Sequence, residues 1–323
     1  MEYSGLTVGI TFAVLGAGLL HATWNALLKS SAGGDAMLDT AAVVAGSSLW
    51  GLVALPFVPM PQPAAWSFIA TSAAIHFGYY VTLAQAYRRG DLSFAYPLMR
   101  GTAPLIVAVL GSIFLRELPS VPMMLGIALI SIGVISIAFV QRGARPPRRA
   151  ARATGGARRG ESTPPPTRDA ILQERAEGGR RAHPPSAARW AFANAAIIAA
   201  YTLVDGAGAR ASGNAFAYVA WLIFLEGLPF LAWVMYRRGR PAVVYLRAST
   251  RTGLVGGACS LAAYGIVLWA MTRAPIAAVA ALRETSVLFA ALMGTVWLKE
   301  GFGWRRVAGA ASVVAGIAAL KLG

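Results

Sequence analysis

The sequence contains very little cysteine, histidine and acid. Of its 323 residues one is a cysteine, Cys259, so no disulfide framework and no cysteine-based metal-ligand spacing is possible. Charged residues make up 13% of the chain, whereas a soluble domain usually carries about 25%. No GxxxxGK[ST] segment is present, so direct use of ATP has no support. We therefore expect no metal, no cofactor and no enzymatic activity.

The positive charge of the chain is concentrated in one segment. The formal net charge is +16, and twelve of the 29 basic residues lie between Arg142 and Arg189. This segment is rich in Pro, Gly and Arg and poor in apolar residues, so it cannot build a core. We predict a disordered linker over 142–187, with a short helix near Asp169–Ala176 and contact with anionic lipid headgroups as a side role. Because the charge is not spread over a folded face, we expect no nucleic-acid partner.

Long hydrophobic runs dominate the rest of the chain. Hydrophobic residues make up 57% of the sequence and the mean hydropathy is +0.58. Runs of about 20 apolar residues match the thickness of a bilayer. The first run lacks a preceding basic region and Glu2 is acidic, so we interpret it as a retained span and not as a cleaved signal peptide. The sequence predicts an all-α integral membrane protein with ten transmembrane helices, at 6–28, 36–57, 65–87, 92–115, 120–141, 188–209, 215–236, 250–272, 275–298 and 303–322.

The segments before and after the linker resemble each other. A shift of about 183 residues places Arg100 on Arg283 and the segment FLRE at 114–117 on WLKE at 297–300. One register that aligns both intramembrane arginines and both acidic helix ends favours an internal repeat. Glu117 and Glu300, at the ends of their spans, are expected to meet headgroups or loops. Three further pairs align at a shift of about 183 or 181: Gly126 with Gly309, Gly133 with Gly316, and Lys29 with Arg210.

An odd number of spans in each repeat forces the second copy to lie upside down in the bilayer. Inverted repeats are a transporter architecture, with the substrate site near the midplane where the copies meet. The paired glycines at seven-residue spacing indicate close helix packing. We predict two inverted five-helix repeats, at 1–141 and 188–323, joined by the linker 142–187.

Three segments carry a resemblance to a known family: LLHATWNALLKSS in the first span, AYPLMRGTAPLIVAVLGSIFLRE in the fourth and AAVAALRETSVLFAALMGTVWLKE in the ninth. The chain resembles the drug/metabolite transporter superfamily, and within it the EamA-type ten-helix exporters. The resemblance covers both five-helix halves but not the linker, which is longer and more basic than is usual for the family. It implies that the fifth and tenth spans pack outside a central cavity that the other spans surround.

Arg100 is the most informative polar residue. A charge at mid-membrane depth costs roughly 2.5–3.5 kcal/mol on insertion scales, so either a partner in the protein or a solvated cavity should offset it. Pro97 and Pro104 each remove a backbone donor near it and leave carbonyls that need other partners. One interpretation is a substrate site at Arg100 and Arg283. The other is a buried ion pair across the halves, such as Arg100 with Glu284.

Glu284 is not expected to pair with its neighbour Arg283, because adjacent residues on a helix point about 100° apart. Two arginines and three acids, Asp205, Glu226 and Glu284, fall within the predicted spans. If the acids neutralise the arginines, a zwitterion such as an amino acid would fit. A buried carboxylate that holds a proton near neutral pH could drive export, and we favour Glu226 over Asp205 for this role. The alternative for Glu226 is a hydrogen-bonded packing acid.

Polar stripes on two further helices complete the candidates. His21, Asn25 and Lys29 recur at intervals of four residues, as do Ser72, His76 and Tyr80. Such a face lines a cavity or hydrogen-bonds to a neighbouring helix, and Lys29 is expected to reach the interface. The candidate substrate-binding residues are Arg100, Arg283, His21, Trp24, Asn25, Tyr80, Tyr96, Tyr201 and Tyr264. The candidate proton-coupling residues are Glu226, Asp205, Glu284 and His76.

These observations predict a secondary transporter of the cytoplasmic (inner) membrane. It would export a small polar metabolite, an amino acid or an amphipathic drug by alternating access, coupled to protons. A membrane scaffold whose charges only join helices, and less favoured an intramembrane enzyme, remain alternatives. Loop charges place the basic linker in the cytoplasm and both termini outside. The family resemblance implies both termini inside, so the orientation stays open.

Overall fold

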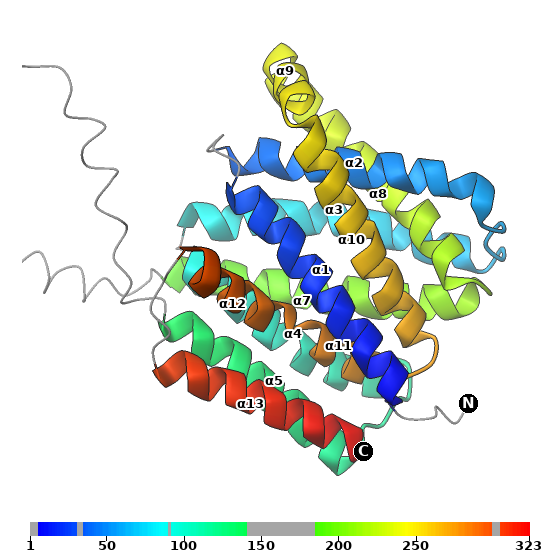
Figure 1. The fold of residues 1–323 in the computed structure, drawn as a ribbon. Helices are drawn as coiled ribbons and strands as arrows, with labels where there is room; N and C mark the ends of the chain where they lie inside the picture. The colour runs from blue at the N-terminus through cyan, green and yellow to red at the C-terminus, as the bar shows by residue number, and fades with distance from the viewer. Residues whose placement is uncertain (1–5, 31–34, 90–91, 141–184, 299–303) are drawn as a thin grey trace, which may run out of the picture.

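The computed structural model describes residues 6–30, 35–89, 92–140, 185–298 and 304–323 (Figure 1). Within these ranges every regular element is a helix. The predicted linker lies almost wholly outside the described residues, and α7 begins at Pro185, just before the predicted end of that linker. The helices are α1 Val8–Ser30, α2 Ala36–Ala54, the 3-10 helix η1 Leu55–Phe57, α3 Ala65–Arg89, α4 Leu92–Phe114, α5 Val121–Val140, α7 Pro185–Ala211, α8 Ala215–Arg238, α9 Arg240–Ala248, α10 Thr250–Met271, α11 Ile276–Arg283, α12 Ser286–Leu298 and α13 Trp304–Lys321.

Each apolar segment predicted from the sequence coincides with a helix or with two consecutive helices. The segment 275–298 was predicted as one span but is divided, because α11 ends at Arg283 and α12 begins at Ser286. In the described residues seven segments are long and apolar enough to cross a membrane. The apolar parts of α5 and α13 are shorter, Val121–Ser136 and Val307–Lys321, and α3 is not among the seven. The chain is thus all-helical where described, with several apolar spans.

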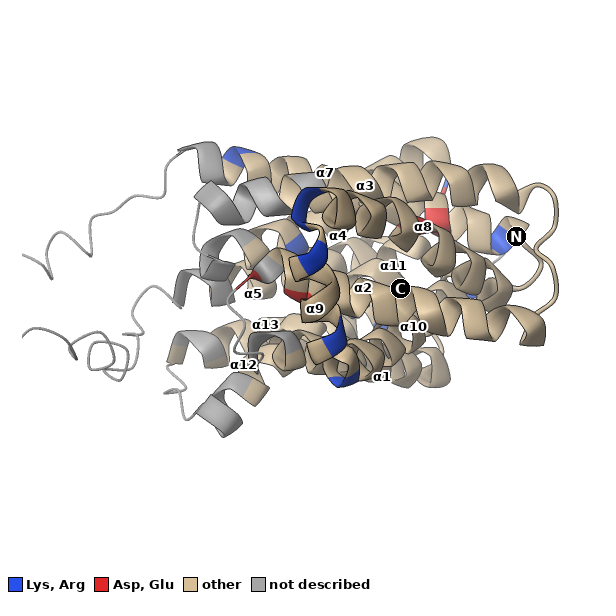
Figure 2. Cartoon of the chain, turned by 90° about the horizontal axis from the view of Figure 1, so that it is seen from above, with Lys and Arg blue, Asp and Glu red and all other residues tan. Residues whose placement is uncertain are grey.

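The outer surface of the bundle suits contact with lipid. Large apolar side chains are exposed on it, among them Phe12, Ile113, Leu125 and Ile132. In water a contiguous apolar surface of this kind would favour aggregation, whereas lipid chains solvate it well. Figure 2 shows that the visible outer sides of the helices carry few charges, and that blue Lys and Arg segments gather on and beside α9.

The helices lie side by side, with α5 and α13 together at one edge and α9 at the opposite edge (Figure 1). The start of α1 and the end of α13 lie at the same end of the bundle. In the interior, α1 packs against α10 and α12, α7 packs against α3 and α4, and α2 packs against α8 and α10. The helices of the first half are therefore held mainly by helices of the second half.

Glycines bring α5 and α13 into close contact. A Cβ atom added to Gly126 would lie 2.8 Å from the carbonyl oxygen of Gly316, and one added to Gly133 would lie 2.7 Å from that of Gly309. Real Cβ atoms do not approach this closely, so only glycine permits the two backbones to meet. The prediction that these four glycines form close-packing faces is confirmed.

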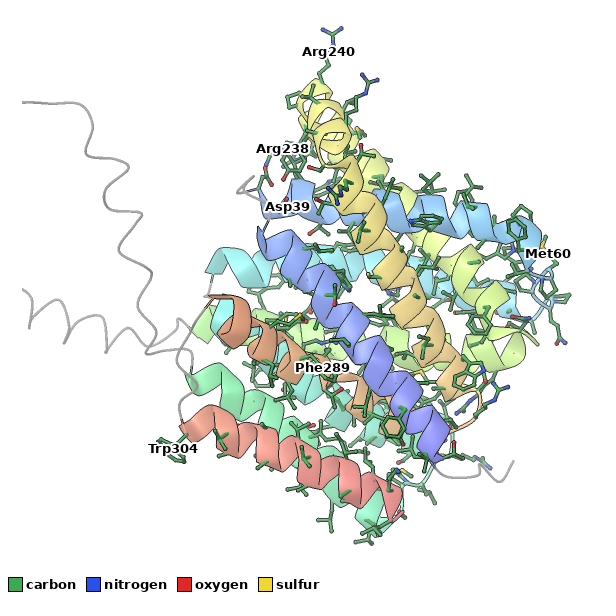
Figure 3. The ribbon with its side chains drawn as sticks, viewed as in Figure 1. Asp39, Met60, Arg238, Arg240, Phe289 and Trp304 are labelled. Carbon is green, nitrogen blue, oxygen red and sulfur yellow. The ribbon has the colours of Figure 1, made fainter. Side chains whose placement is uncertain are left out.

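The start of α2 is tied to α9. Asp35 caps α2 by accepting hydrogen bonds from the backbone amides of Met37 and Leu38, at 3.1 and 3.4 Å. Its second carboxylate oxygen lies 2.8 Å from Nη2 of Arg238, the last residue of α8. Asp39, one turn into α2, accepts a hydrogen bond from the hydroxyl of Tyr245 on α9. Figure 3 shows Asp39 and Arg238 near this contact, with Arg240 at the outer tip of α9.

Candidate functional site

Arg100 of α4 and Glu284 form an ion pair that joins the two halves of the chain. The Nε atom of Arg100 lies 2.7 Å from Oε2 of Glu284. The side chains are 7% and 0% exposed, so the pair is shielded from solvent. The crossed pairing predicted as the alternative to a substrate-binding Arg100 is therefore confirmed.

Glu284 also contacts its neighbour Arg283, which corrects the expectation that adjacent residues would not pair. The Nε and Nη2 atoms of Arg283 each lie 3.5 Å from Oε1 of Glu284. The expectation assumed a continuous helix, but α11 ends at Arg283 and regular helix resumes only at Ser286. Glu284 keeps near-helical dihedrals of φ −70° and ψ −9°, so the contact is made at its limit by two long side chains. Glu284 is therefore shared between two buried guanidinium groups.

His21 and Ser286 complete the surroundings of Arg100. Its Nη2 atom donates to Ser286 Oγ at 3.4 Å and lies 3.5 Å from Nε2 of His21. The indole Nε1 of Trp24 lies 3.3 Å from the other ring nitrogen of His21. A neutral imidazole has only one acceptor nitrogen, so the indole and the guanidinium compete for it. A neutral His21 therefore cannot accept a hydrogen bond from both of these neighbours.

Two other candidates around Arg100 have local partners. The guanidinium of Arg100 lies over the ring of Tyr96, one turn earlier in α4, at 5.9 Å from the ring centroid. The side-chain amide of Asn25 donates to the backbone carbonyl of His21, at 2.8 Å. The amide is thus engaged within its own helix. The side chain of Lys29, on the same predicted stripe, lies outside the described residues.

His76 and Glu226 form the centre of a second cluster. Nδ1 of His76 lies 3.2 Å from Oε2 of Glu226, with side chains 9% and 13% exposed. The same ring nitrogen lies 3.1 Å from Ser72 Oγ and 3.0 Å from the Ser72 carbonyl oxygen. The contact links α3 to α8, so Glu226 does not lie alone among apolar side chains.

Asp205, in α7, is fully buried and hydrogen-bonded to two tyrosines. The hydroxyl of Tyr218 donates to Oδ1 at 2.9 Å, and the hydroxyl of Tyr264 donates to Oδ2. Three helices, α7, α8 and α10, thus meet at one carboxyl group. These donors offset the cost of burying the acid.

Aromatic rings lie around the His76 cluster. The ring of Tyr201 stacks on His76 with centroids 4.3 Å apart, and Tyr79 meets Tyr201 edge to face at 5.9 Å. Tyr80 instead stacks on Phe230 at 4.4 Å. Tyr79, Tyr96 and Tyr201 belong to one apolar cluster that includes residues of α3, α4 and α7. The aromatic candidates therefore border both charged clusters.

Glu117 was not predicted as a site residue, and the structure corrects its expected place among headgroups and loops. Its Oε1 lies 2.5 Å from Nη1 of Arg210, and its Oε2 accepts from the backbone amide of Ile276 at 2.9 Å. Arg210 also donates to the carbonyl oxygens of Met271 and Ala274. The ends of α4, α7 and α10 and the start of α11 are thereby joined. Glu300, its counterpart in the second half, lies outside the described residues.

The charged groups therefore form two interior clusters and, at the end of the bundle, a clasp made by Glu117 and Arg210. The first cluster contains two arginines and one acid. The second contains His76 and Glu226, and Asp205 adjoins it through Tyr264, whose ring lies 6.5 Å edge to face from that of His76. In the described ranges no group of three or more His, Cys, Asp and Glu side chains is arranged to hold a metal ion. Reversible ion pairing and proton transfer are the chemistry that these side chains offer.

Comparison with known proteins agrees with this arrangement. The model of the EamA-like transporter family matches two segments, residues 7–139 and 186–322. One solved crystal structure, described only as that of a protein, aligns with a TM-score of 0.68 and 17% identity, over 97% of this chain and 98% of its own. At that identity the likeness shows the fold alone. No curated protein sequence matches the chain. Because the family model covers most of the chain in two matches, this protein belongs to the EamA-like transporter family and is a multi-pass membrane transporter.

Proposed function

We propose that the protein is a secondary transporter that exports a small polar metabolite, an amino acid or an amphipathic drug across the cytoplasmic membrane by alternating access. The observation that carries this proposal is the buried ion pair between Arg100 and Glu284, which lies where the two halves of the chain meet. A charge pair there gives the halves a polar centre whose contacts can be exchanged with those of a solute.

We propose further that ten helices cross the membrane as two inverted repeats, 1–141 and 188–323. The packing supports this, because exchanging helices for their counterparts reproduces several of the contacts between the two halves. The contact of α1 with α10 corresponds to that of α7 with α3, and the contact of α1 with α12 corresponds to that of α7 with α4. Two further contacts join a helix to its own counterpart, α2 with α8 and α5 with α13, and the exchange leaves them unchanged. The glycine contacts obey the same exchange, since Gly126 meets Gly316 and Gly133 meets Gly309.

We assign proton coupling to Glu226 and His76. Both side chains are largely buried, and 3.2 Å separates a carboxylate oxygen from a ring nitrogen. A proton can be held by either group, and its uptake or release by the pair would change the charge of the centre without a metal or a cofactor. Asp205 is less suited, because both its oxygens accept from tyrosine hydroxyls and a proton on either one would compete with such a donor. The linker 142–187 is assigned to contact with anionic lipid headgroups.

Flux through purified protein in liposomes tests the function. A pH gradient should drive accumulation or release of at least one solute from a broad panel of amino acids and metabolites, and empty liposomes should show none. Glu226→Gln should remove the dependence on the pH gradient. A protein that moves no solute would fit a scaffold, and chemical conversion of a solute would fit an enzyme.

A further inference from the structure

The two arginines that the internal repeat aligns have different environments. Arg100 lies 2.7 Å from Glu284, donates to Ser286 and lies over the ring of Tyr96. Arg283 is as deeply buried, with 6% of its side chain exposed, but Glu284 approaches it only to 3.5 Å. Among the described residues the one hydrogen bond of the Arg283 guanidinium is the contact of Nη2 with Glu284, whereas Nη2 of Arg100 reaches Ser286 as well as His21. The Nε atoms of both arginines lack a well-aligned acceptor, although that of Arg100 lies much closer to Glu284. The arginine with the weaker contacts is therefore Arg283.

A guanidinium group has five N–H donors and is charged at every physiological pH. Burying such a group is costly unless its charge is paired and its donors find acceptors. Both contacts of Arg283 converge on a single oxygen, Oε1 of Glu284, at the limit of a hydrogen bond. Glu284 already neutralises Arg100 with its other oxygen. Most of the donor capacity of Arg283 is therefore unused.

The charge of the cluster indicates what is missing. Arg100 and Arg283 contribute two positive charges and Glu284 one negative charge, so a single positive charge remains in excess. One monovalent anion would balance the cluster, whereas a phosphate monoester would bring about −1.5 to −2 and overcompensate it. A carboxylate matches the planar fork of a guanidinium with two parallel hydrogen bonds. His21, which lies beside Arg100, offers one further ring nitrogen close to the same place.

We propose that Arg283 binds the carboxylate group of the transported solute, and that Arg100 positions the site by holding Glu284. The substrate class is therefore organic acids and zwitterions that carry one carboxylate. The inference rests on the proposed transport function and adds a division of roles between the paired arginines. Tyr96, whose ring lies under the Arg100 guanidinium, and Tyr201, which belongs to the same apolar cluster, supply aromatic surface for the remainder of the solute.

Binding of four matched probes to the purified full-length protein tests this assignment. The probes are leucine, leucinamide, 4-methylpentanoate and 4-methylpentanamide, which vary the carboxylate and the ammonium group independently. The wild type should bind each carboxylate about 10- to 100-fold more tightly than its amide, as loss of a charged bidentate contact implies. Arg283→Gln should bring both ratios close to one, because the carboxylates lose the contact that the amides never make. Arg283→Lys keeps the charge without the fork and should give intermediate ratios.

Arg100→Gln should lower the melting temperature, because it leaves Glu284 with the weaker partner. It should also lower the carboxylate-to-amide ratio, because Glu284 is then free to neutralise Arg283. The matched control is Arg100→Gln/Glu284→Gln, which leaves Arg283 as the one charge of the cluster and should keep the ratio. The proposal is overturned if Arg283→Gln or Arg283→Lys keeps the full ratio, if the folded Arg100→Gln/Glu284→Gln variant loses it, or if the wild type binds neither carboxylate. Flux through the wild type distinguishes failure of the Arg283 assignment from failure of the transport function. If the protein transports only solutes that lack a carboxylate, it is a transporter but Arg283 does not bind a solute carboxylate.

Discussion

Arg210 and Glu117 join the end of α7 to the end of α4, with 2.5 Å between Nη1 and Oε1. Glu117 comes from the first half of the chain, whereas Arg210, Ile276 and Met271 come from the second. This clasp lies at the same end of the bundle as the start of α1 and the end of α13. It closes one end of the interface between the halves, and any motion that opens that end has to break it.

The clasp should contribute measurable coupling energy. Glu117→Gln and Arg210→Gln should each lower the melting temperature in detergent, and the double variant should lose less than the sum of the two. We expect an interaction energy of about 0.5–3 kcal/mol, because the residues share one largely buried hydrogen-bond network. A double-mutant cycle measures it. Strict additivity of the two single effects would show that the interaction between Glu117 and Arg210 does not contribute to stability.

The central ion pair should be costly to break from one side. Arg100→Gln is expected to destabilise the protein by about 3–5 kcal/mol, since Glu284 remains buried with only the longer contact to Arg283. Adding Glu284→Gln should restore part of that loss. Thermal unfolding of the single and double variants provides the measurement. A double variant less stable than Arg100→Gln alone would contradict a pair held mainly by charge.

Proton coupling should depend on the carboxyl group of Glu226. Glu226→Gln retains the size of the side chain but cannot exchange a proton with His76, so pH-driven accumulation should disappear while solute exchange at equal pH continues. Asp39→Asn is the control, because it removes a carboxylate at the start of α2, where Tyr245 donates to it. Liposome assays with and without a pH gradient distinguish the two. Unchanged pH-driven accumulation in Glu226→Gln would remove Glu226 from the coupling role.

The contact between α5 and α13 should not tolerate a methyl group. Gly133→Ala places a Cβ atom 2.7 Å from the Gly309 carbonyl oxygen, and we expect a loss of about 1–3 kcal/mol from the forced separation of the helices. Gly16→Ala is the matched control, because a Cβ atom there meets nothing within 4 Å. That substitution lies within a helix and should be neutral or stabilising. Melting temperatures of the two variants should therefore shift in opposite directions or by clearly different amounts.

The attachment of α9 should weaken in alkali. The hydrogen bond from Tyr245 to Asp39 raises the pKa of the Tyr245 hydroxyl above its usual value near 10. A raised folded-state pKa means that the contribution to stability is complete below about pH 10 and is lost as the pH rises through the folded-state value. Tyr245→Phe should reproduce that loss at neutral pH. Hydrogen exchange of α9 should then be faster than in the wild type, and equal rates would contradict the contact.

Much of the fold could be predicted from the sequence because lipid imposes a simple rule on the chain. Every backbone polar group inside a bilayer must be satisfied within a helix, so length and hydropathy locate helices without knowledge of their neighbours. The predicted segments accordingly coincide with helices. The same logic located Arg100 and Glu284, because few charges lie within apolar runs and a buried charge requires a partner.

Apart from the pairing of Arg100 with Glu284, the tertiary structure decided which groups meet. The break between α11 and α12 has no proline or glycine signal, and Glu117 at a helix end resembles any surface acid. The pairing of Glu226 with His76 and of Asp205 with two tyrosines depends on how each helix is rotated about its axis. By itself the sequence determined which segments are helical and which charges need partners, since both follow from local hydropathy and the cost of burial. The choice of partner depends on side-chain packing between helices far apart in the chain, and no local pattern encodes it.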